Sequence, residues 1–337
     1  MVGMFFMIEN VLMDVLKDAQ AYIIEMLDMT KNSKCDGKIK VKVPDYIPEL
    51  AKANPEHLGV CVITTKGQCY HAGNWMQNFT MQSIAKTITL ILALKSVGSQ
   101  EVFSRVGMEP TGDAFDSISK LERKALPFNP MINAGAISTA SCCIKNGNDP
   151  YVDFLELVHK LCGCNTIKID NAVYISEKNA GMRNRAMAYL LEDAKVLKCK
   201  ADDAVDFYFK TCSTSVNTKD LAHYAMILAN NGKNPLNGEI IVDEWIIPII
   251  KSIMLTCGMY DSSGEFAVNV GMPAKSGIGG GIMACAKNNL GIATFGPVLD
   301  EKGNSVGGVR MLERLSKKLG LHMFSEKIYY QYDKEFF

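Results

Sequence analysis

The order of the hydrophobic patterns along the chain limits most strongly how this sequence can fold. Strand-like runs occur near the beginning and again near the end of its 337 residues, and helical periodicity dominates the middle. We therefore predict an α/β (α+β) fold, in which one antiparallel sheet flanked by helices is built from N-terminal and C-terminal pieces. An all-helical domain is inserted between these pieces.

The N-terminal piece begins with an amphipathic pattern over residues 8–29, which predicts a helix. The polar run 31–38, which contains Gly37, is typical of a linker. The apolar face of the predicted helix consists of Ile8, Val11, Leu12, Val15, Leu16, Ala19 and Ile23.

The next segment combines a hairpin signal with a helix signal. Two apolar runs, 58–64 and 69–73, flank Lys66-Gly67 and predict a β-hairpin. A strongly apolar helical pattern then extends from residue 82 to 97 and stops at Gly98.

Helical periodicity continues until strand-like runs return near the end of the chain. The runs 280–286 and 290–295 surround the turn signal Asn288-Asn289, and a closing helix is predicted over 309–319. In the middle of the chain, helices are predicted over 131–145, 152–161, 185–197, 218–229 and 243–255.

These patterns divide the chain into three parts. Residues 1–35 are predicted to form an N-terminal helical extension, 36–105 and 270–337 together the sheet domain, and 106–269 the helical domain. A nucleophile at the start of the first buried helix would lie in the cleft between the two larger parts. We therefore expect the active site in that cleft.

The charge balance and hydropathy exclude several classes of partner. Lysine and arginine together number 36, as do aspartate and glutamate, so we expect no nucleic acid and no anionic membrane as partner. No run of about 18 uncharged apolar residues is present, so we expect no transmembrane helix. The first ten residues lack the basic region of a secretory signal, and we expect a cytoplasmic protein.

The cysteines and histidines show no pattern of a disulfide framework or a metal site. The eleven cysteines are irregularly spaced, and without an export signal they predict free thiols in a reducing compartment. The five histidines pair neither with one another nor with cysteines at ligand spacing. We therefore expect no metal and no cofactor.

A candidate nucleophile lies in Ser83-Ile-Ala-Lys86, at the start of the apolar helical pattern. Residues i and i+3 share a helix face, so the lysine amine can reach the serine hydroxyl. A desolvated lysine has a lowered pKa and can take the proton of that hydroxyl. A second copy of the pattern, Ser117 to Lys120, lies in a polar stretch, and we interpret it as a chance match.

A second motif, Lys275-Ser276-Gly277, is followed by a glycine-rich run that leads into a predicted strand. Penicillin-recognising serine hydrolases combine S-x-x-K with K-[ST]-G in this order. Glycines allow a strand backbone to approach a ligand closely, and its N–H groups could help to form an oxyanion hole.

These motifs, with others in the same order, make the chain resemble the serine-dependent glutaminases, which share the β-lactamase and penicillin-binding-protein type of fold. The resemblance covers about residues 42–320. The motifs that carry it, each numbered by its first residue, are in chain order Asp45-Tyr-Ile-Pro-Glu-Leu-Ala, Gln82-Ser-Ile-Ala-Lys, Asn129-Pro-Met-Ile-Asn-Ala-Gly-Ala, Ser176-Glu, Arg183-Asn-Arg-Ala, Asp206-Phe-Tyr-Phe-Lys-Thr-Cys-Ser, Leu228-Ala-Asn-Asn-Gly, Cys257-Gly-Met-Tyr-Asp-Ser-Ser-Gly-Glu-Phe and Pro273-Ala-Lys-Ser-Gly-Ile-Gly-Gly-Gly-Ile.

The resemblance implies a role for each matched site residue. It implies that Ser83 is the nucleophile, Lys86 its general base and Tyr260 a proton relay. Free L-glutamine presents an ammonium, a carboxylate and an amide, and Glu177 is suited to pair with the ammonium. The implied substrate-binding residues are Tyr46, Ser83, Asn133, Glu177, Asn184, Tyr208, Tyr260 and, through its main chain, Ile278.

The implied activity is hydrolysis of glutamine to glutamate and ammonia through a serine-bound γ-glutamyl ester. Two alternatives stay open at this point: a penicillin-recognising serine hydrolase, and an inactive binding relative. The resemblance also implies a homodimer or homotetramer.

Overall fold

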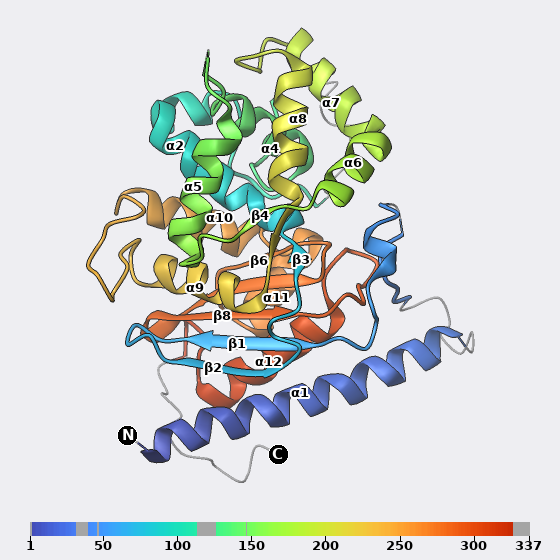
Figure 1. Cartoon of the computed structure of the whole chain (residues 1–337), viewed down its shortest axis with the longest axis vertical. Coiled ribbons are helices and arrows are strands. Elements are labelled where there is room, and N and C mark those ends of the chain that lie inside the picture. Colours follow the sequence, from blue (N-terminus) through green and yellow to red (C-terminus); the bar gives the residue numbers. More distant parts are fainter. Residues whose placement is uncertain (1, 32–39, 46, 113–125, 146, 326–337) are drawn as a thin grey trace.

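The main sheet joins the two ends of the chain. A computed structural model describes residues 2–31, 40–45, 47–112, 126–145 and 147–325. Its five-stranded antiparallel sheet has the order β2-β1-β8-β7-β6 (Figure 1). Because β1 pairs with β8, the predicted sheet of N-terminal and C-terminal pieces is confirmed. The strands are β1 (Gly59–Ile63), β2 (Cys69–Gly73), β6 (Ala274–Ser276), β7 (Gly281–Ala286) and β8 (Leu290–Phe295).

Both predicted hairpins are present, and left-handed residues form their turns. Gly67, between β1 and β2, has a φ of 75°, which glycine adopts without a Cβ clash. Asn288 and Asn289, between β7 and β8, have φ values of 62° and 57° and belong to the short 3₁₀ turn η4 (Lys287–Asn289). Asparagine tolerates this region better than most residues, so the predicted turn is confirmed.

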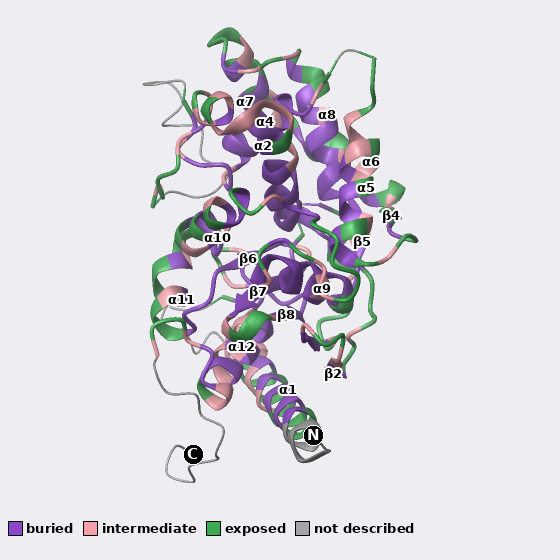
Figure 2. Cartoon of the chain, turned by 90° about the vertical axis from the view of Figure 1, so that its left-hand side faces the viewer, coloured by how far each residue is buried: buried purple, intermediate pink, exposed green. Residues whose placement is uncertain are grey.

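The alternation of side chains along the strands divides the core into two clusters. Cys61 and Ile63 of β1 face one cluster, whereas Val60 and Val62 face the other. Successive side chains of a strand point to opposite faces, and here both faces are covered. Figure 2 shows buried residues in the central strands, and exposed ones in the loops and on the outer helix faces.

Helices α1 (Val2–Lys31) and α12 (Val306–Leu319) cover one face of the sheet. All seven residues of the predicted apolar face of the first helix are buried, which confirms that prediction. Asp18 of α1 accepts hydrogen bonds from Arg310 and Arg314 of α12 at 2.6–3.3 Å. Figure 1 shows the long α1 lying across this side of the sheet.

On the opposite face, α9 (Thr218–Ala229) packs against β8, β1 and β7. Gly291 of β8 has no room for a Cβ, because the backbone of Ala222 and Met226 in α9 lies against it. Helix α10 (Ile246–Cys257) packs against β6, and α11 (Ser263–Asn269) follows it. Both α9 and α10 come from the middle of the chain, so helices of this segment also cover the sheet. The division into three parts and the boundaries given above stay predictions.

The remaining helices pack together above the sheet in Figure 1. The helix predicted to begin at residue 82 begins instead at Ala85, after the 3₁₀ turn η2 (Gln82–Ile84). Gly98 interrupts it with a φ of 81°, and helical structure then resumes. The helices packed together above the sheet are α2 (Ala85–Phe103), α4 (Asn133–Ser141), α5 (Pro150–Cys162), α6 (Asn171–Ala180), α7 (Met182–Asp193) and α8 (Ala201–Cys212).

Two of these helices, α6 and α8, and a second small sheet were not predicted. The sheet has the order β3-β5-β4, with β3 (Phe79–Thr80), β4 (Lys168–Ile169) and β5 (Thr214–Val216). Its strands contain two or three residues, which is too short to produce a visible alternation in sequence. The predicted linker 31–38 lies outside the described residues, apart from Lys31 at the end of α1. Among the helices of the described part, none has the length and hydropathy that crossing a bilayer requires.

The docking of α1 on the sheet can be tested at two neighbouring positions of that helix. Leu12 is fully buried, whereas the side chain of Met13 is 45% exposed. We expect Leu12→Ala to lower the free energy of unfolding by about 2–5 kcal/mol, because it leaves a cavity between α1 and the sheet. Met13→Ala should change it by less than about 0.5 kcal/mol. Urea unfolding of both variants measures this, and equal losses would show that α1 does not contribute through its buried face.

Candidate active site

Ser83 lies between strand β3 of the small sheet and helix α2, the first buried helix. It follows β3 and belongs to the turn η2, and only 6% of its surface is exposed. The preceding residue, Gln82, has a φ of 48°, a left-handed conformation that is rare for a side chain of this type. Such backbone strain is concentrated at functional sites, so this turn is a reasonable location for a nucleophile.

Lys86 follows one turn later, at the start of α2, and is 2% exposed. Its Nζ donates to the carbonyl of Met131 at 2.9 Å and to Oδ1 of Asn133 at 2.7 Å. The ring centroid of Tyr208 lies 5.8 Å from Nζ. An amine buried to this extent must be held by hydrogen bonds. One acceptor belongs to the first residue of α4, and the other lies two residues before it.

The Lys275-Ser276-Gly277 motif packs directly against the nucleophile segment. Lys275 and Ser276 belong to β6, and the turn after it contains Ile278, which is 4% exposed. A Cβ on Gly277 would meet the carbonyl oxygen of Met81, and one on Gly279 that of Thr80. The glycines are therefore required because this turn touches the backbone that leads to Ser83.

Tyr260 connects Ser83 with the motif. Its hydroxyl is hydrogen-bonded to the side chain of Ser83 and also donates to the carbonyl of Ser276 at 3.2 Å. Burial raises the pKa of the phenol, and the hydrogen bond to Ser83 opposes this rise. Tyr260 lies in the short 3₁₀ turn η3 (Tyr260–Ser262), with a φ of 53°.

Lys275 is a second buried amine beside Tyr260, and no role was predicted for it from the sequence. Its Nζ lies 4.4 Å from the centroid of the Tyr260 ring and donates to the carbonyls of Gly258 (3.0 Å) and Ser276 (2.6 Å). Burial, followed by the charge of Lys86, lowers its pKa well below the usual value. The K-[ST]-G motif itself was the signal that could have identified this residue.

Glu177 of α6 is a carboxyl group that is 94% buried. Burial raises its pKa to about 7, although a hydrogen bond with Gln82 and the charge of Lys86 both act to lower it. Gln82 therefore connects Glu177 to the turn of Ser83, a contact that the sequence analysis did not identify. The only signal was its position directly before the candidate nucleophile.

Three more of the predicted residues form one hydrogen-bonded group. Asn133 begins α4, and its Oδ1 accepts from the hydroxyl of Tyr208 at 3.2 Å in addition to Lys86. Its Nδ2 donates to Oδ1 of Asn184 in α7 at 3.0 Å. The structure thus joins Asn184 and Tyr208 through Asn133, which also accepts from the amine of Lys86.

Two of the predicted features lie outside the described residues. These are Tyr46 and the second S-x-x-K pattern, Ser117 to Lys120. Within the described ranges, no three His, Cys, Asp or Glu side chains are grouped so that they could hold a metal ion.

A cavity of about 450 Å³ lies beside this group. Tyr260 and Met131 belong to its lining, as do Asn129, Ile132 and Cys257. Its volume is within the range of small-molecule sites in proteins. Met131, whose carbonyl accepts from Lys86, and Tyr260, which contacts Ser83, therefore both border this cavity, whereas Ser83 and Lys86 themselves do not line it.

The five-stranded sheet with helices on both faces, and the serine and lysine at the start of a buried helix, define a protein of the β-lactamase-like fold, as predicted. The sequence matches the Glutaminase family over residues 42–324. Glutaminase 2 of Clostridium perfringens is 50% identical over 286 residues, which cover 84% of this chain and 94% of that protein. A glutaminase of Clostridium botulinum (strain Loch Maree / Type A3) is 49% identical with the same coverage. The chain therefore belongs to the glutaminase family.

Solved structures agree with this assignment. A probable glutaminase from Bacillus subtilis complexed with 6-diazo-5-oxo-L-norleucine superimposes with a TM-score of 0.80 at 34% identity. The superposition covers 92% of this chain and 94% of the chain in that structure. The Bacillus subtilis glutaminase YbgJ, in covalent complex with 5-oxo-L-norleucine, gives a TM-score of 0.81 at 33% identity and covers 94% and 99%.

Because the pKa of Glu177 is raised in the folded chain, ionisation of this group lowers the free energy of unfolding by an amount that depends on pH. Below the ordinary carboxyl pKa of 4.5, Glu177 is protonated in both the folded and the unfolded chain. Between 4.5 and about 7 the folded chain holds the proton more tightly, so stability falls as pH rises through this window. Since one pKa unit corresponds to about 1.4 kcal/mol, the loss approaches about 3 kcal/mol at pH 8.

Glu177→Gln removes this titration. We expect the variant to gain stability relative to wild type between pH 4.5 and pH 8, by up to about 3 kcal/mol. Denaturant unfolding at a series of pH values measures the difference. Glu156→Gln, at a side chain of α5 that is 69% exposed, serves as the matched control. A difference independent of pH would contradict the raised pKa.

Proposed function

We propose that this chain is an L-glutamine amidohydrolase, which forms glutamate and ammonia with Ser83 as its nucleophile. The observation that carries the proposal is the contact of the buried Ser83 with Tyr260, one helical turn before the buried amine of Lys86. Membership of the glutaminase family supplies the reaction.

The related structures support a covalent route. In the Bacillus subtilis complex, reaction of the protein with 6-diazo-5-oxo-L-norleucine produced a covalent adduct with 5-oxo-L-norleucine. That compound has the chain of glutamine with a ketone in place of the side-chain amide. A protein nucleophile therefore acts near this position in that relative. We assign the same position here to Ser83.

The reaction proceeds in two displacements. The Oγ of Ser83 attacks the side-chain amide carbon of glutamine, while Lys86 takes the hydroxyl proton. The bond between the amide carbon and nitrogen then breaks, and ammonia leaves with a proton returned through Lys86 or Tyr260. Water then attacks the γ-glutamyl ester, and the ester bond to Ser83 breaks to release glutamate. No metal or organic cofactor takes part in these steps.

The contacts of Lys86 support its role as base. Its amine donates to two acceptors, the carbonyl of Met131 and Oδ1 of Asn133. A neutral amine can keep both bonds and still accept a proton at its lone pair. Because Asn133 binds Lys86 directly, we propose that it positions the base in addition to contacting the substrate.

We assign the recognition of the substrate to the polar group around Ser83. Glu177 would pair with the α-ammonium, and its burial makes a charged partner valuable. The main chain of Ile278 and the N–H of Ser83 would stabilise the oxyanion. The remaining proposed contacts to the carboxylate and the amide are Tyr46, Asn133, Asn184, Tyr208 and Tyr260.

We also propose a cytoplasmic homodimer or homotetramer. The ten cysteines of the described ranges are all free thiols, which is consistent with a reducing compartment. The two alternatives, a penicillin-recognising hydrolase and an inactive relative, are less well supported. The named relatives are glutaminases, and both Ser83 and Lys86 are present.

The nucleophile and base can be tested with one matched set of variants. Ser83→Ala and Lys86→Ala should each lower kcat by about three orders of magnitude or more, because each removes a group that makes or breaks bonds. Lys120→Ala, in the other S-x-x-K pattern, should leave kcat within about twofold of wild type. Ammonia release from glutamine measures all three. Turnover of Ser83→Ala within about tenfold of wild type would contradict the assignment.

The substrate range tests Glu177. N-acetyl-glutamine lacks the α-ammonium, and asparagine would hold its amide one methylene short of Ser83, so both should be very poor substrates. Glu177→Gln should raise KM for glutamine by about a hundredfold, since the ammonium loses its charged partner. Specificity constants for the three compounds measure this. If wild type hydrolyses N-acetyl-glutamine as well as glutamine, the substrate is a capped or peptide amide instead.

A further inference from the structure

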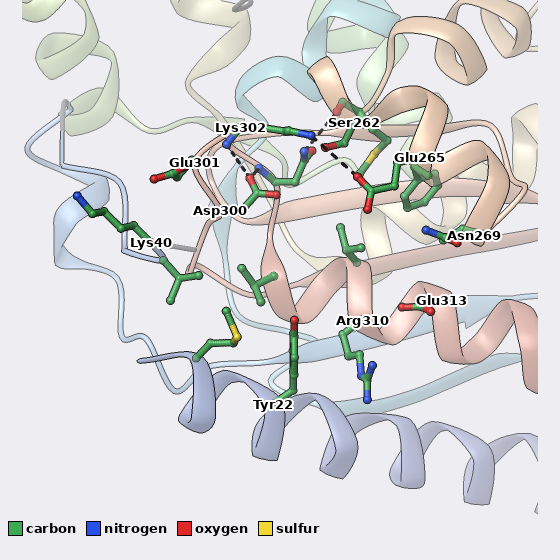
Figure 3. Close-up of a pocket in the computed structure, with 18 residues that line it drawn as sticks. Tyr22, Lys40, Ser262, Glu265, Asn269, Asp300, Glu301, Lys302, Arg310 and Glu313 are labelled. Carbon is green, nitrogen blue, oxygen red and sulfur yellow. Dashed lines mark hydrogen bonds and ion pairs between the residues drawn. The ribbon is translucent and has the colours of Figure 1, made fainter. Parts of the chain in front are cut away.

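A second cavity, of about 500 Å³, lies on the other side of the turn that carries Tyr260. It is enclosed by α1, α11, the segment between β8 and α12, and α12 itself. In Figure 3, Asp300, Lys302 and Glu265 lie on one side of it, and Tyr22 and Arg310 on the opposite side. Of the described residues proposed to contact the substrate, Ser83 included, none lines it.

The lining contains a buried polar atom without a partner. Asn304 is 1% exposed, and its Nδ2 donates to the carbonyl of Met259 at 3.2 Å. Its Oδ1 is buried and has no hydrogen-bond partner within the described residues. A buried acceptor left in this state costs roughly 1–3 kcal/mol, so a hydrogen-bond donor placed at Oδ1 would be stabilising.

A carboxylate lies beside this acceptor. Oδ1 of Asp300 accepts the backbone N–H groups of Lys302 (3.0 Å) and Asn304 (2.8 Å). In the described part of the chain no cation lies within ion-pair distance of Asp300: the amine of Lys302 reaches Glu265 at 3.9 Å, and its charge acts on Asp300 only from farther away. Burial raises the pKa of Asp300, against these backbone bonds. A cation in the cavity would compensate this cost.

The other charged groups of the lining favour a cation over an anion. Arg310 is occupied by Asp18 at 2.6 Å, and its guanidinium lies 4.9 Å from the centroid of the Tyr22 ring. Glu313 is paired with Lys317 at 2.7 Å. Lys40 also belongs to the lining, but an anion there would still meet the carboxylates of Asp300 and Glu301. The rest of the lining is apolar and consists mainly of Met26, Val41, Phe266, Val270, Val306 and Val309.

We propose that this cavity binds the primary ammonium group of an aliphatic amine. The ammonium donates to Oδ1 of Asn304 and pairs with the carboxylate of Asp300, while the alkyl chain packs against the apolar side of the cavity, beside Phe266 and Val306. A primary ammonium supplies three N–H donors and a positive charge. It thus satisfies both of the groups that the protein leaves without a sufficient partner.

The turn η3 separates this site from the active site and could transmit its occupancy. Met259 and Ser262 line the amine cavity, whereas Tyr260, Asp261 and Ser263 line the cavity beside the active site. The amide of Asn304 holds the carbonyl of Met259, directly before Tyr260. After burial, the charge of Asp300 is among the causes that raise the pKa of Tyr260. An ammonium paired with Asp300 would weaken this effect.

The test uses the full chain with Ser83→Ala, so that no turnover occurs, in the presence of saturating glutamine. Calorimetric titrations compare n-butylammonium, ammonium, tetramethylammonium and butyrate. We expect n-butylammonium to bind, and the other three to bind at least about tenfold more weakly. They lack, respectively, the alkyl chain, the N–H donors and the positive charge. Equal binding of any of them would contradict the proposed chemistry.

Variants locate the binding. Asp300→Asn keeps an acceptor for the backbone N–H groups but removes the charge, and it should weaken binding of n-butylammonium by about tenfold or more. Val306→Trp should abolish binding by filling the cavity, with its melting temperature measured as a check on folding. Glu156→Gln, on the exposed side of α5, removes a remote charge and should have no effect.

Glu177→Gln separates this proposal from the proposed function. Binding of n-butylammonium that survives Asp300→Asn but is lost in Glu177→Gln would place the amine in the active site and overturn the inference. Binding that is lost in Asp300→Asn and kept in Glu177→Gln supports it, whether or not the chain hydrolyses glutamine.

Discussion

The pairing of β1 with β8 is the contact on which the rest of the structure depends. Ile63 lies opposite Gly291 and Gly59 opposite Phe295, so the two ends of the chain meet in the centre of one sheet. β7 and β6 continue the sheet from β8 and carry the Lys275-Ser276-Gly277 motif to its edge. The N-terminal piece continues from β2 into the turn of Ser83. Without the central pairing, the motif and the nucleophile would have no fixed relation.

Strands and helices with a regular apolar pattern were predictable from the sequence. The segment 218–229 coincides with α9, and 290–295 with β8, because each is a mainly apolar run bounded by asparagine or glycine residues. Helix α6 was missed because the larger apolar residues of its sequence, Val173 to Ile175, are consecutive and do not recur at helical spacing; only Val173 and Glu177 are buried. Tertiary contacts rather than local pattern hold such an element.

The individual site residues were named mainly by family resemblance, and the reason is physical. Glu177, Asn133 and Tyr208 belong to α6, α4 and α8, which meet only in the folded chain. No spacing in the sequence encodes that meeting. Ser83 and Lys86 are different, because i and i+3 are neighbours on any helix. Gln82 and Lys275 could also have been singled out from the sequence, because each belongs to or adjoins one of the two motifs. The contact of Gln82 with Glu177 could not have been predicted in this way.

The central pairing also has a consequence for how the chain is made. During synthesis β1 leaves the ribosome long before its partner β8 exists, and hydrophobic strands without partners are prone to aggregate. The hairpin of β1 and β2 therefore has an unpaired edge at β1 while the helical segments are translated. Contacts between such distant residues also slow folding. Helix α9, which covers both β1 and β8, is translated between them and can shield the face of β1 during this interval.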